Sequence, residues 1–363
     1  MRSVLRLLEG DQTIGRGLPF WGLMSLLFAG ALAFGVTAGS FAVENCSYFL
    51  VWVFMALGLA FMWGLGGTMS FGQTAFFGIG GYCYAILSTN WGVESGLTMA
   101  AALLSLAAVA LSAAVLGYFV FFGGINGVLV SITTLAVTLG LETFLSQTAG
   151  PKWAIGRAEL GGFNGISSMP PLTVPWHGDN VEITGRSLYF GLIIFVAITY
   201  LALRILANSK VGDAMVAVRE SPLRAEALGY DVKAILFVGF VVGSVLAGLS
   251  GLLYAGWGQY ISPDTMGLSA AALPIIWVAV SGKDLTATMV GTVVLLGLSQ
   301  ALAIYGSQYA LVSLALILVV SIMGCPKGVF ETLLRRIDSI GGPGDQNSKP
   351  VRKSSLDRSE VLL

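Results

Sequence analysis

The sequence is poor in charged residues. Asp, Glu, Lys and Arg make up only 10% of its 363 residues, whereas soluble globular chains carry roughly 25%. Hydrophobic residues make up 56%, and this balance excludes a water-soluble fold of this length. The 19 basic and 19 acidic residues cancel, so bulk electrostatics gives no reason to expect a nucleic-acid partner.

Cysteine and histidine are scarce as well. Cys46, Cys83 and Cys325 lie far apart, without the paired spacing of a zinc site or a redox pair, and we interpret them as packing residues. The only histidine, His177, lies in a polar loop, which excludes a helical zinc-protease motif and most embedded enzyme schemes. We therefore expect no metal and no cofactor bound by this chain.

Long apolar runs are what the sequence has in abundance. A membrane-spanning helix needs about 20 apolar residues, and nine runs suit such a helix. A tenth run, 268–281, is short and contains Pro274, so we expect it to be tilted or broken. The nine runs are 19–41, 48–65, 71–88, 97–121, 127–147, 187–207, 234–256, 287–304 and 308–323. We predict an all-α integral membrane protein with about ten transmembrane segments, in a transmembrane domain of residues 19–330.

The basic residues predict the orientation, because cytoplasmic loops are enriched in Lys and Arg. With the N-terminus inside and ten crossings, only Lys152, Arg157 and Arg186 face outward. Both the N-terminal segment, 1–18, and the tail, 331–363, are then cytoplasmic. The tail is rich in Gly, Ser, Pro and Lys, so we expect it to be disordered.

The outer loop, 148–186, is turn-rich and carries Trp153 and Trp176. Such aromatic residues suit the membrane interface. The loop either contacts an external partner or lies on the membrane, and its composition does not decide between the two.

Small residues recur at every fourth position of the run 234–256. This spacing places them on one face of a helix, where a neighbouring helix approaches closely. We assign the face to helix packing, and its members are Gly239, Gly243, Ala247 and Gly251.

The stretch 64–73 places four glycines and several hydroxyl or amide groups between two apolar runs. One helix ends there and the next begins near Ser70, a suitable N-cap residue. Uncharged irregular backbone near membrane depth is tolerated only against protein or a water-filled path. Ser70 and Gln73 are therefore candidates for the translocation path, and a plain tight turn is the alternative.

Glu142 is the only acidic residue well inside a predicted span. Intramembrane carboxylates are functional candidates, and Thr134 and Thr138 extend a polar stripe along the same helix face. We take these three residues as further candidates for the path. Pairing of Glu142 with a polar neighbour, or snorkelling to the outer surface, is the alternative.

The internal loop 208–233 contains a bracketed two-turn helix. Ser221 suits the N-cap, Pro222 the first helical position and Gly229 the position after the helix. The charged residues around it either decorate an ordinary surface helix or contact a soluble partner.

Four segments in order resemble one known family. Residues 212–230, followed by the small-residue span, resemble the coupling loop of LivM-type permeases, which belong to branched-chain amino acid importers of the ATP-binding cassette superfamily. Residues 70–82, 161–165 and 326–328 resemble other segments of these permeases. The resemblance covers about residues 48–330.

The resemblance implies a transport mechanism in the bacterial inner membrane. It implies a second homologous permease, two ATPase subunits, an external solute-binding protein and surrounding membrane lipid. It also implies that five residues contact the ATPase: Arg219, Glu220, Arg224, Glu226 and Gly229. No phosphate-binding loop motif occurs in the sequence, so the partner subunits are expected to use the ATP.

Two branches of the family, with different substrates, each resemble part of this sequence. Residues 275–283 and 162–165 are similar to the urea-importer branch, whereas 139–142 are similar to the amino acid branch. We expect branched-chain amino acids first, and urea or a short amide second. A secondary transporter needs more intramembrane charge than Glu142 alone, and an aquaporin-type channel needs Asn-Pro motifs, which do not occur.

Overall fold

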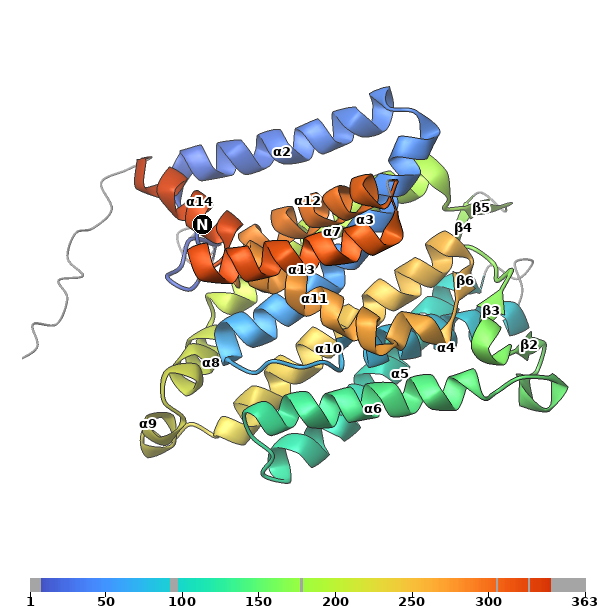
Figure 1. Ribbon diagram of the computed structural model, residues 1–363, viewed down its shortest axis with the longest axis horizontal. Coiled ribbons are helices and arrows are strands. Elements are labelled where there is room, and N and C mark those ends of the chain that lie inside the picture. Colours follow the sequence, from blue (N-terminus) through green and yellow to red (C-terminus); the bar gives the residue numbers. More distant parts are fainter. Residues whose placement is uncertain (1–7, 92–96, 177–178, 305, 326, 341–363) are drawn as a thin grey trace, which may run out of the picture.

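The computed structural model describes residues 8–91, 97–176, 179–304, 306–325 and 327–340 as a bundle of long helices lying roughly side by side (Figure 1). Two of the long helices continue into a turn of π-helix: α3 into η1 (Phe61–Leu65) and α5 into η2 (Tyr118–Phe122). The long helices are α2 (Gly17–Thr37), α3 (Ser40–Ala60), α4 (Gln73–Trp91), α5 (Thr98–Gly117), α6 (Val128–Ser146), α7 (Gly185–Ala207), α10 (Val232–Gly258), α11 (Leu268–Ser281), α12 (Leu285–Ala303) and α13 (Ser307–Gly324).

Each of the ten predicted apolar runs largely overlaps one of these helices. Within the described residues, seven helices are long and apolar enough to cross a membrane, and α4, α11 and α13 are not among them. Helix α11 has 14 residues, or about 21 Å at 1.5 Å per residue, less than the hydrocarbon thickness of about 30 Å. Pro274 lies inside α11 without ending it. The number of about ten crossings stays a prediction.

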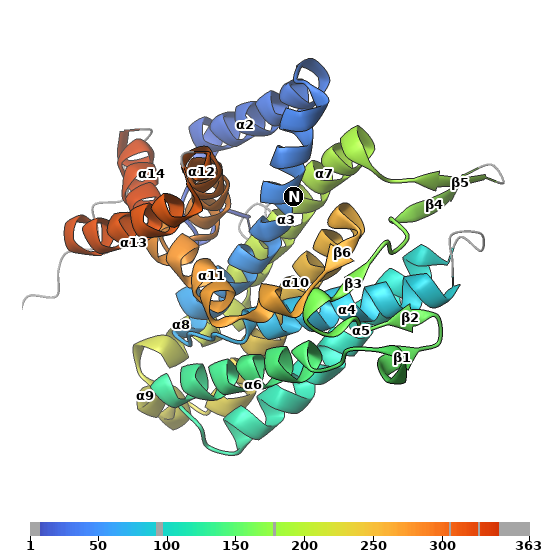
Figure 2. The ribbon, with the colours of Figure 1, turned by 45° about the vertical axis from the view of Figure 1, so that its right-hand side comes forward.

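Helices α3, α4 and α10 form the centre of the bundle, and α2 lies at its edge (Figures 1 and 2). Glycines allow the central helices to approach closely. A Cβ built on Gly58 of α3 would lie 2.6 Å from the Gly243 carbonyl oxygen of α10, and one built on Gly251 would overlap the Phe77 carbonyl of α4. Gly239 faces Met215, and Ala247 is fully buried. The small-residue face therefore lies against three different elements.

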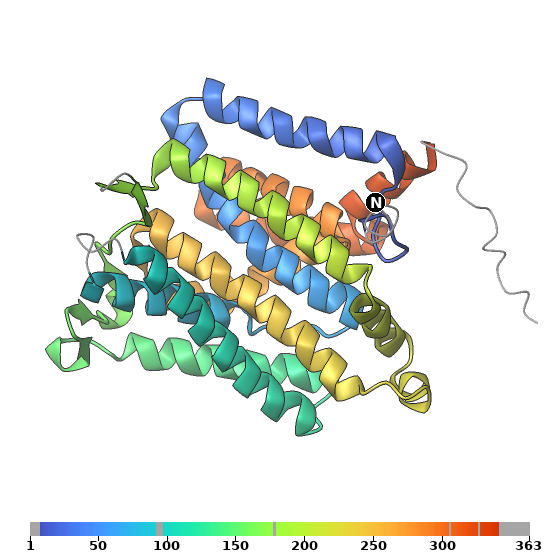
Figure 3. The same cartoon turned by 180° about the vertical axis from the view of Figure 1, so that it is seen from behind.

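The two ends of the bundle differ in structure (Figures 1 and 3). One end carries α8 (Lys210–Glu220), α9 (Pro222–Ala227) and α14 (Val329–Ile340), and we call it the coupling end. The opposite end, the strand end, carries three antiparallel strand pairs. They are β1 (Ala154–Ile155) with β2 (Ala158–Glu159), β3 (Ile166–Ser167) with β6 (Tyr260–Ile261), and β4 (Thr173–Trp176) with β5 (Asp179–Glu182).

The all-α prediction is therefore wrong for the outer loop, where 3-10 turns η3 (Pro151–Trp153) and η4 (Gly162–Asn164) connect short strands. One pair joins this loop to the connection between α10 and α11, which contains η5 (Pro263–Met266). Gly156 directly follows β1, and Pro263 follows β6 after one residue, so these two strands end early. His177 lies outside the described residues.

The first part of the predicted disordered tail is a helix. Helix α14 places Phe330 and Leu334 on one face, separated by a helical turn. Glu331 is buried and accepts a hydrogen bond from the Lys283 backbone nitrogen at 3.1 Å. Docking against the turn between α11 and α12 therefore orders this segment, and the prediction of disorder is wrong for residues 331–340.

An N-terminal strap, residues 8–16, crosses the coupling end. The Arg204 guanidinium is fully buried and donates to the carbonyl oxygens of Leu8 at 2.5 Å and Ile14 at 3.1 Å. The Ile14 backbone nitrogen donates to Asp284 Oδ2 at 2.9 Å. The strap therefore ties the end of α7 to the beginning of α12.

Candidate coupling and translocation site

Local sequence chemistry sets the position of α9. The Ser221 Oγ accepts a hydrogen bond from the Arg224 backbone nitrogen at 3.4 Å, and Pro222 occupies the first helical position. Gly229 adopts a φ of 89° just beyond the helix, a conformation that glycine tolerates without strain. The predicted two-turn helix is confirmed.

The outward side of α9 is apolar at two positions. Leu223 and Leu228 are 80% and 76% exposed, whereas Ala225 is buried between α8 and α10. Arg224 and Glu226 are also exposed. Exposed leucines flanked by charges are typical of a surface that contacts another protein. We call Leu223, Arg224, Glu226 and Leu228 the α9 surface.

Arg219, at the end of α8, contacts its own chain. Its Nη1 donates to the carbonyl oxygen of Gly64, in η1, and its Nη2 lies 2.8 Å from Glu220 Oε1. A Cβ built on Gly67, which has a φ of 71°, would lie 2.8 Å from Arg219 Cγ. Arg219 therefore connects the coupling end directly to the end of α3.

Lys283 also contacts η1. Its Nζ lies 4.4 Å from the centre of the Trp63 ring, within cation–π distance. Partial burial and the neighbouring Arg219 cation lower the pKa of Lys283. A Cβ built on Gly64 would lie 2.5 Å from the Lys283 carbonyl oxygen. The π-helical turn is thus held between α8 and the turn that joins α11 to α12.

The loop 66–72, which follows η1, runs along the polar face of α6. The Ser131 Oγ donates to the Met69 carbonyl oxygen at 2.8 Å. The Phe71 backbone nitrogen donates to Thr134 Oγ1 at 3.2 Å, and the Thr138 Oγ1 donates to the Phe71 carbonyl oxygen at 3.2 Å.

Thr138 is ten residues into α6, which corresponds to about 15 Å along the helix. The loop therefore extends about halfway along the bundle before α4 begins. The hydroxyls of α6 take the place of the water that an irregular backbone needs.

Gln73 begins α4 at this depth. Its side chain is 2% exposed, and that of Thr74 is fully buried. Among the described residues, the Gln73 Oε1 and Nε2 and the Thr74 Oγ1 have no hydrogen-bond partner. Ser70 differs, because its Oγ accepts from the Gly72 backbone nitrogen at 3.0 Å. Each buried unpaired polar group costs roughly 1–3 kcal/mol, so this cluster requires an explanation.

Other unpaired polar groups lie on the neighbouring helices. They include the Trp52 Nε1 of α3, the Ser244 Oγ of α10, the Trp277 Nε1 and Ser281 Oγ of α11, and the Thr292 Oγ1 of α12. Aromatic rings lie beside α4, one turn after Gln73: Phe77 stacks on Trp52 at 4.7 Å, and Trp277 meets Trp52 edge-on at 5.7 Å. Unpaired polar atoms beside aromatic faces form an amphipathic environment inside the bundle.

Thr74, Ser244, Trp277, Ser281 and Thr292 were not among the predicted path residues. Isolated hydroxyls in apolar runs are common, because a hydroxyl can bond to its own helix. Only the lack of a partner distinguishes these five, and that depends on the packing of several helices. The sequence signal is therefore weak.

Glu142 has a different environment from the other predicted path residues. It is partly exposed, and its carboxylate oxygens lie 3.4 Å from the hydroxyls of Thr143 and Ser146, both on α6. Thr134 and Thr138 are fully buried against the loop 66–72. The structure thus brings Ser70, Thr134 and Thr138 together and leaves Glu142 further along α6, toward the strand end.

Metal ligands are not clustered in the part of the chain that the structure describes, where no group of three or more His, Cys, Asp and Glu side chains occurs. Seven apolar helices and an irregular loop that enters the bundle indicate a polytopic membrane protein.

Comparison with known proteins identifies the family. Residues 41–323 match the family described as branched-chain amino acid transport system, permease component. The chain belongs to this family, whose members are transport subunits rather than enzymes.

Two relatives are high-affinity branched-chain amino acid transport system permease proteins named LivM. The chain is 25% identical to that of Escherichia coli K12, over 84% of this chain and 73% of the relative. It is 24% identical to that of Salmonella typhimurium LT2, over 85% of this chain and 74% of the relative. No solved structure matches the chain at a significant level.

Proposed function

We propose that this chain is a permease subunit of an ATP-driven importer of branched-chain amino acids in the bacterial inner membrane. It pairs with a second, homologous permease. Two ATPase subunits bind the coupling end, and an external solute-binding protein delivers solute at the strand end. Family membership and the exposed α9 surface support this assembly. The coupling end and both termini are then cytoplasmic, in agreement with the positions of Lys and Arg.

The hydrogen bond from Arg219 to the Gly64 carbonyl oxygen carries the mechanistic part of the proposal. A displacement of α8 and α9 by the ATPases pulls on η1 through this bond. A π-helical turn is rare and often lies at functional sites. The turn therefore serves as a hinge between the ATPase contact and the loop 66–72.

The loop 66–72 and the beginning of α4 form the proposed solute path. A helix that begins inside the bundle directs its partially positive N-terminus at the path, which favours an anionic carboxylate. The unpaired Gln73 amide and Thr74 hydroxyl provide further hydrogen-bonding groups. Thr134 and Thr138 hold the loop beside them, Ser70 stabilises its turn, and Glu142 lies toward the outer entrance.

The aromatic rings favour a branched aliphatic substrate. Trp52 and Phe77 lie one helical turn from Gln73 and offer apolar faces to a side chain whose carboxylate contacts the beginning of α4. Urea has no aliphatic side chain and no carboxylate, so this arrangement gives it less to bind. Branched-chain amino acids therefore stay the first proposal, and urea or a short amide the second.

The assembly is tested by isolating the tagged chain in mild detergent and identifying the proteins that accompany it by mass spectrometry. We expect ATPase subunits and a second permease with the unmodified chain, and loss of the ATPases in Arg224→Glu and Glu226→Arg. Arg157→Glu reverses an exposed charge at the strand end and should retain them. Purification of the chain alone, with ATP-independent solute flux after reconstitution, would contradict the proposal.

The substrate is tested separately by uptake of radiolabelled leucine into cells that express the whole transporter. We expect isoleucine and valine to compete and urea not to compete. Uptake of labelled urea that leucine does not inhibit would support urea as the substrate. The proposed assembly would still hold.

A further inference from the structure

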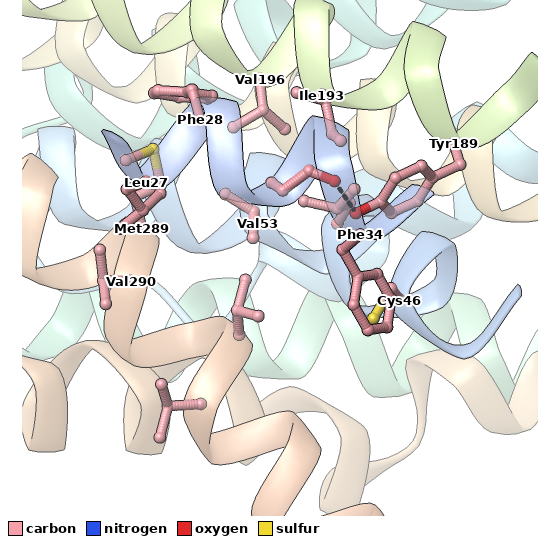
Figure 4. A pocket seen from close by; sticks show the side chains of 14 residues that line it. Leu27, Phe28, Phe34, Cys46, Val53, Tyr189, Ile193, Val196, Met289 and Val290 are labelled. Atoms are coloured by element: carbon pink, nitrogen blue, oxygen red, sulfur yellow. Dashed lines mark hydrogen bonds between the residues drawn. The ribbon is translucent and has the colours of Figure 1, made fainter. Parts of the chain in front are cut away.

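An apolar cavity lies between α2, α3, α7 and α12 (Figure 4). Its volume is about 330 Å³, roughly twice that of an apolar cavity of about 150 Å³ that holds one benzene molecule. Its walls include Leu27 and Phe34 from α2, Val53 from α3, Val196 from α7, and Met289 and Val294 from α12. The cavity is therefore large enough for a segment of a hydrocarbon chain.

The cavity offers almost nothing to a polar occupant. The Tyr189 hydroxyl already donates to the Ala31 carbonyl oxygen at 2.8 Å, as Figure 4 shows. Cys46 contributes a thiol, which is a weak hydrogen-bonding group. A buried water needs two to four polar partners, and a zwitterionic amino acid needs more. Water and the transported solute are both poor occupants of this cavity.

One side of the cavity opens on the outer surface of the bundle. Leu27 and Phe34 are each 39% exposed and Val294 is 49% exposed, whereas Val53, Val196 and Met289 lie deeper and are buried. All four surrounding helices are among the seven apolar enough to span a membrane. The opening therefore faces the hydrocarbon layer, where acyl chains are the surrounding medium.

We propose that this cavity binds an acyl chain of a membrane phospholipid. The chain enters between α2 and α12 and contacts Val53 and Val196 at the inner wall. A polar headgroup stays outside the bundle, because the lining has no group to receive it. The bound chain fills the space between α2 and the central helices, so it stabilises the position of a helix that has few other contacts with the bundle.

Photo-crosslinking tests this site in the full chain reconstituted into phospholipid vesicles. The vesicles contain a small share of phosphatidylethanolamine with a diazirine midway along one acyl chain. Mass spectrometry of the irradiated protein then locates the labelled residues. We expect labelling at the cavity to be severalfold higher than at Leu103 and Leu111, which are exposed on α5 and contact lipid only transiently. Equal labelling at both places would overturn the proposal.

Filling the cavity gives a second test. Val293→Phe should lower cavity labelling severalfold, toward the α5 level, while Leu104→Phe on the exposed face of α5 should leave it unchanged. If Val293→Phe does not fold, it is replaced by Ala31→Leu, which fills less of the cavity. Unchanged labelling in the filled variant would overturn the proposal.

Discussion

Three cations at the coupling end of this permease have partners within the chain, whereas several buried polar groups inside the bundle have none in the part of the chain that the structure describes. Arg204 contacts the N-terminal strap, Arg219 contacts Gly64, and Lys283 lies over Trp63. The Gln73 amide and the Thr74 hydroxyl are about as inaccessible as Arg204, and neither has a partner among the described residues.

The difference separates two roles. A paired group stabilises one arrangement of the helices and transmits a displacement from one element to the next. An unpaired buried group destabilises the fold, and in a transporter it marks a place where solute or water takes the missing position. On the proposed mechanism, the coupling end holds the moving parts together, and the beginning of α4 contacts the transported solute.

Arg204→Ala should have the largest effect on stability. The substitution leaves the strap carbonyls without donors and removes the contacts of the guanidinium with the Phe20 and Trp21 rings. We expect a loss of about 3 kcal/mol or more in unfolding free energy. This loss is measured as a fall in the thermal midpoint of the purified protein.

Arg16→Ala is the matched control. Arg16 pairs with Asp11 where both side chains are more than half exposed, so its removal should cost less than about 1 kcal/mol. Similar losses of unfolding free energy for the two substitutions would show that the buried hydrogen bonds of Arg204 contribute no more than an exposed ion pair.

Arg219→Ala should have the next largest effect, and mainly on transport. It removes a charged hydrogen bond worth about 1.5–3 kcal/mol, and a comparable loss of coupling lowers uptake roughly tenfold or more. ATPase subunits should still accompany the chain, because the α9 surface is intact. Leucine uptake and subunit retention are measured on the same membranes.

Lys210→Ala, at the exposed beginning of the same helix, should leave both uptake and subunit retention unchanged. Loss of the ATPases from Arg219→Ala would show that Arg219 contacts them directly and does not act through Gly64.

Thr138→Val should have a smaller effect. Valine has a similar shape, but it cannot donate to the Phe71 carbonyl oxygen. We expect a loss of about 1 kcal/mol in unfolding free energy. Ser112→Ala removes a hydroxyl that bonds only within α5 and should change the thermal midpoint less. An unchanged midpoint for Thr138→Val would show that α6 does not hold the loop 66–72.

Much of the fold follows from the sequence because its signals are local. Ser221, Pro222 and Gly229 bracket α9 within nine residues, and each apolar run largely overlaps one long helix. Local signals do not predict which apolar helix becomes central. In α3, 83% of the best membrane-spanning window is buried, against 17% in α2, although both helices are long and apolar enough to cross a membrane.

The site was less predictable, because it depends on partners far apart in the chain. Arg204 is separated from Leu8 by 196 residues, and in the sequence it looks like an ordinary basic residue at the end of a span. Arg219 was expected to contact the ATPase, and its contact with Gly64 depends on a π-helical turn that no residue pattern indicated. Whether it also contacts the ATPase stays a prediction.

The most direct test of the account is Gln73→Leu, measured for both stability and leucine uptake. Leucine is apolar and similar in size to glutamine, although it branches at Cγ, and it removes an amide that has no partner, so the thermal midpoint should stay the same or rise. Uptake should be lost, because the group that contacts solute is gone. Unchanged uptake, or a fall in uptake together with a lower thermal midpoint, would contradict the assignment of this unpaired group to the solute path.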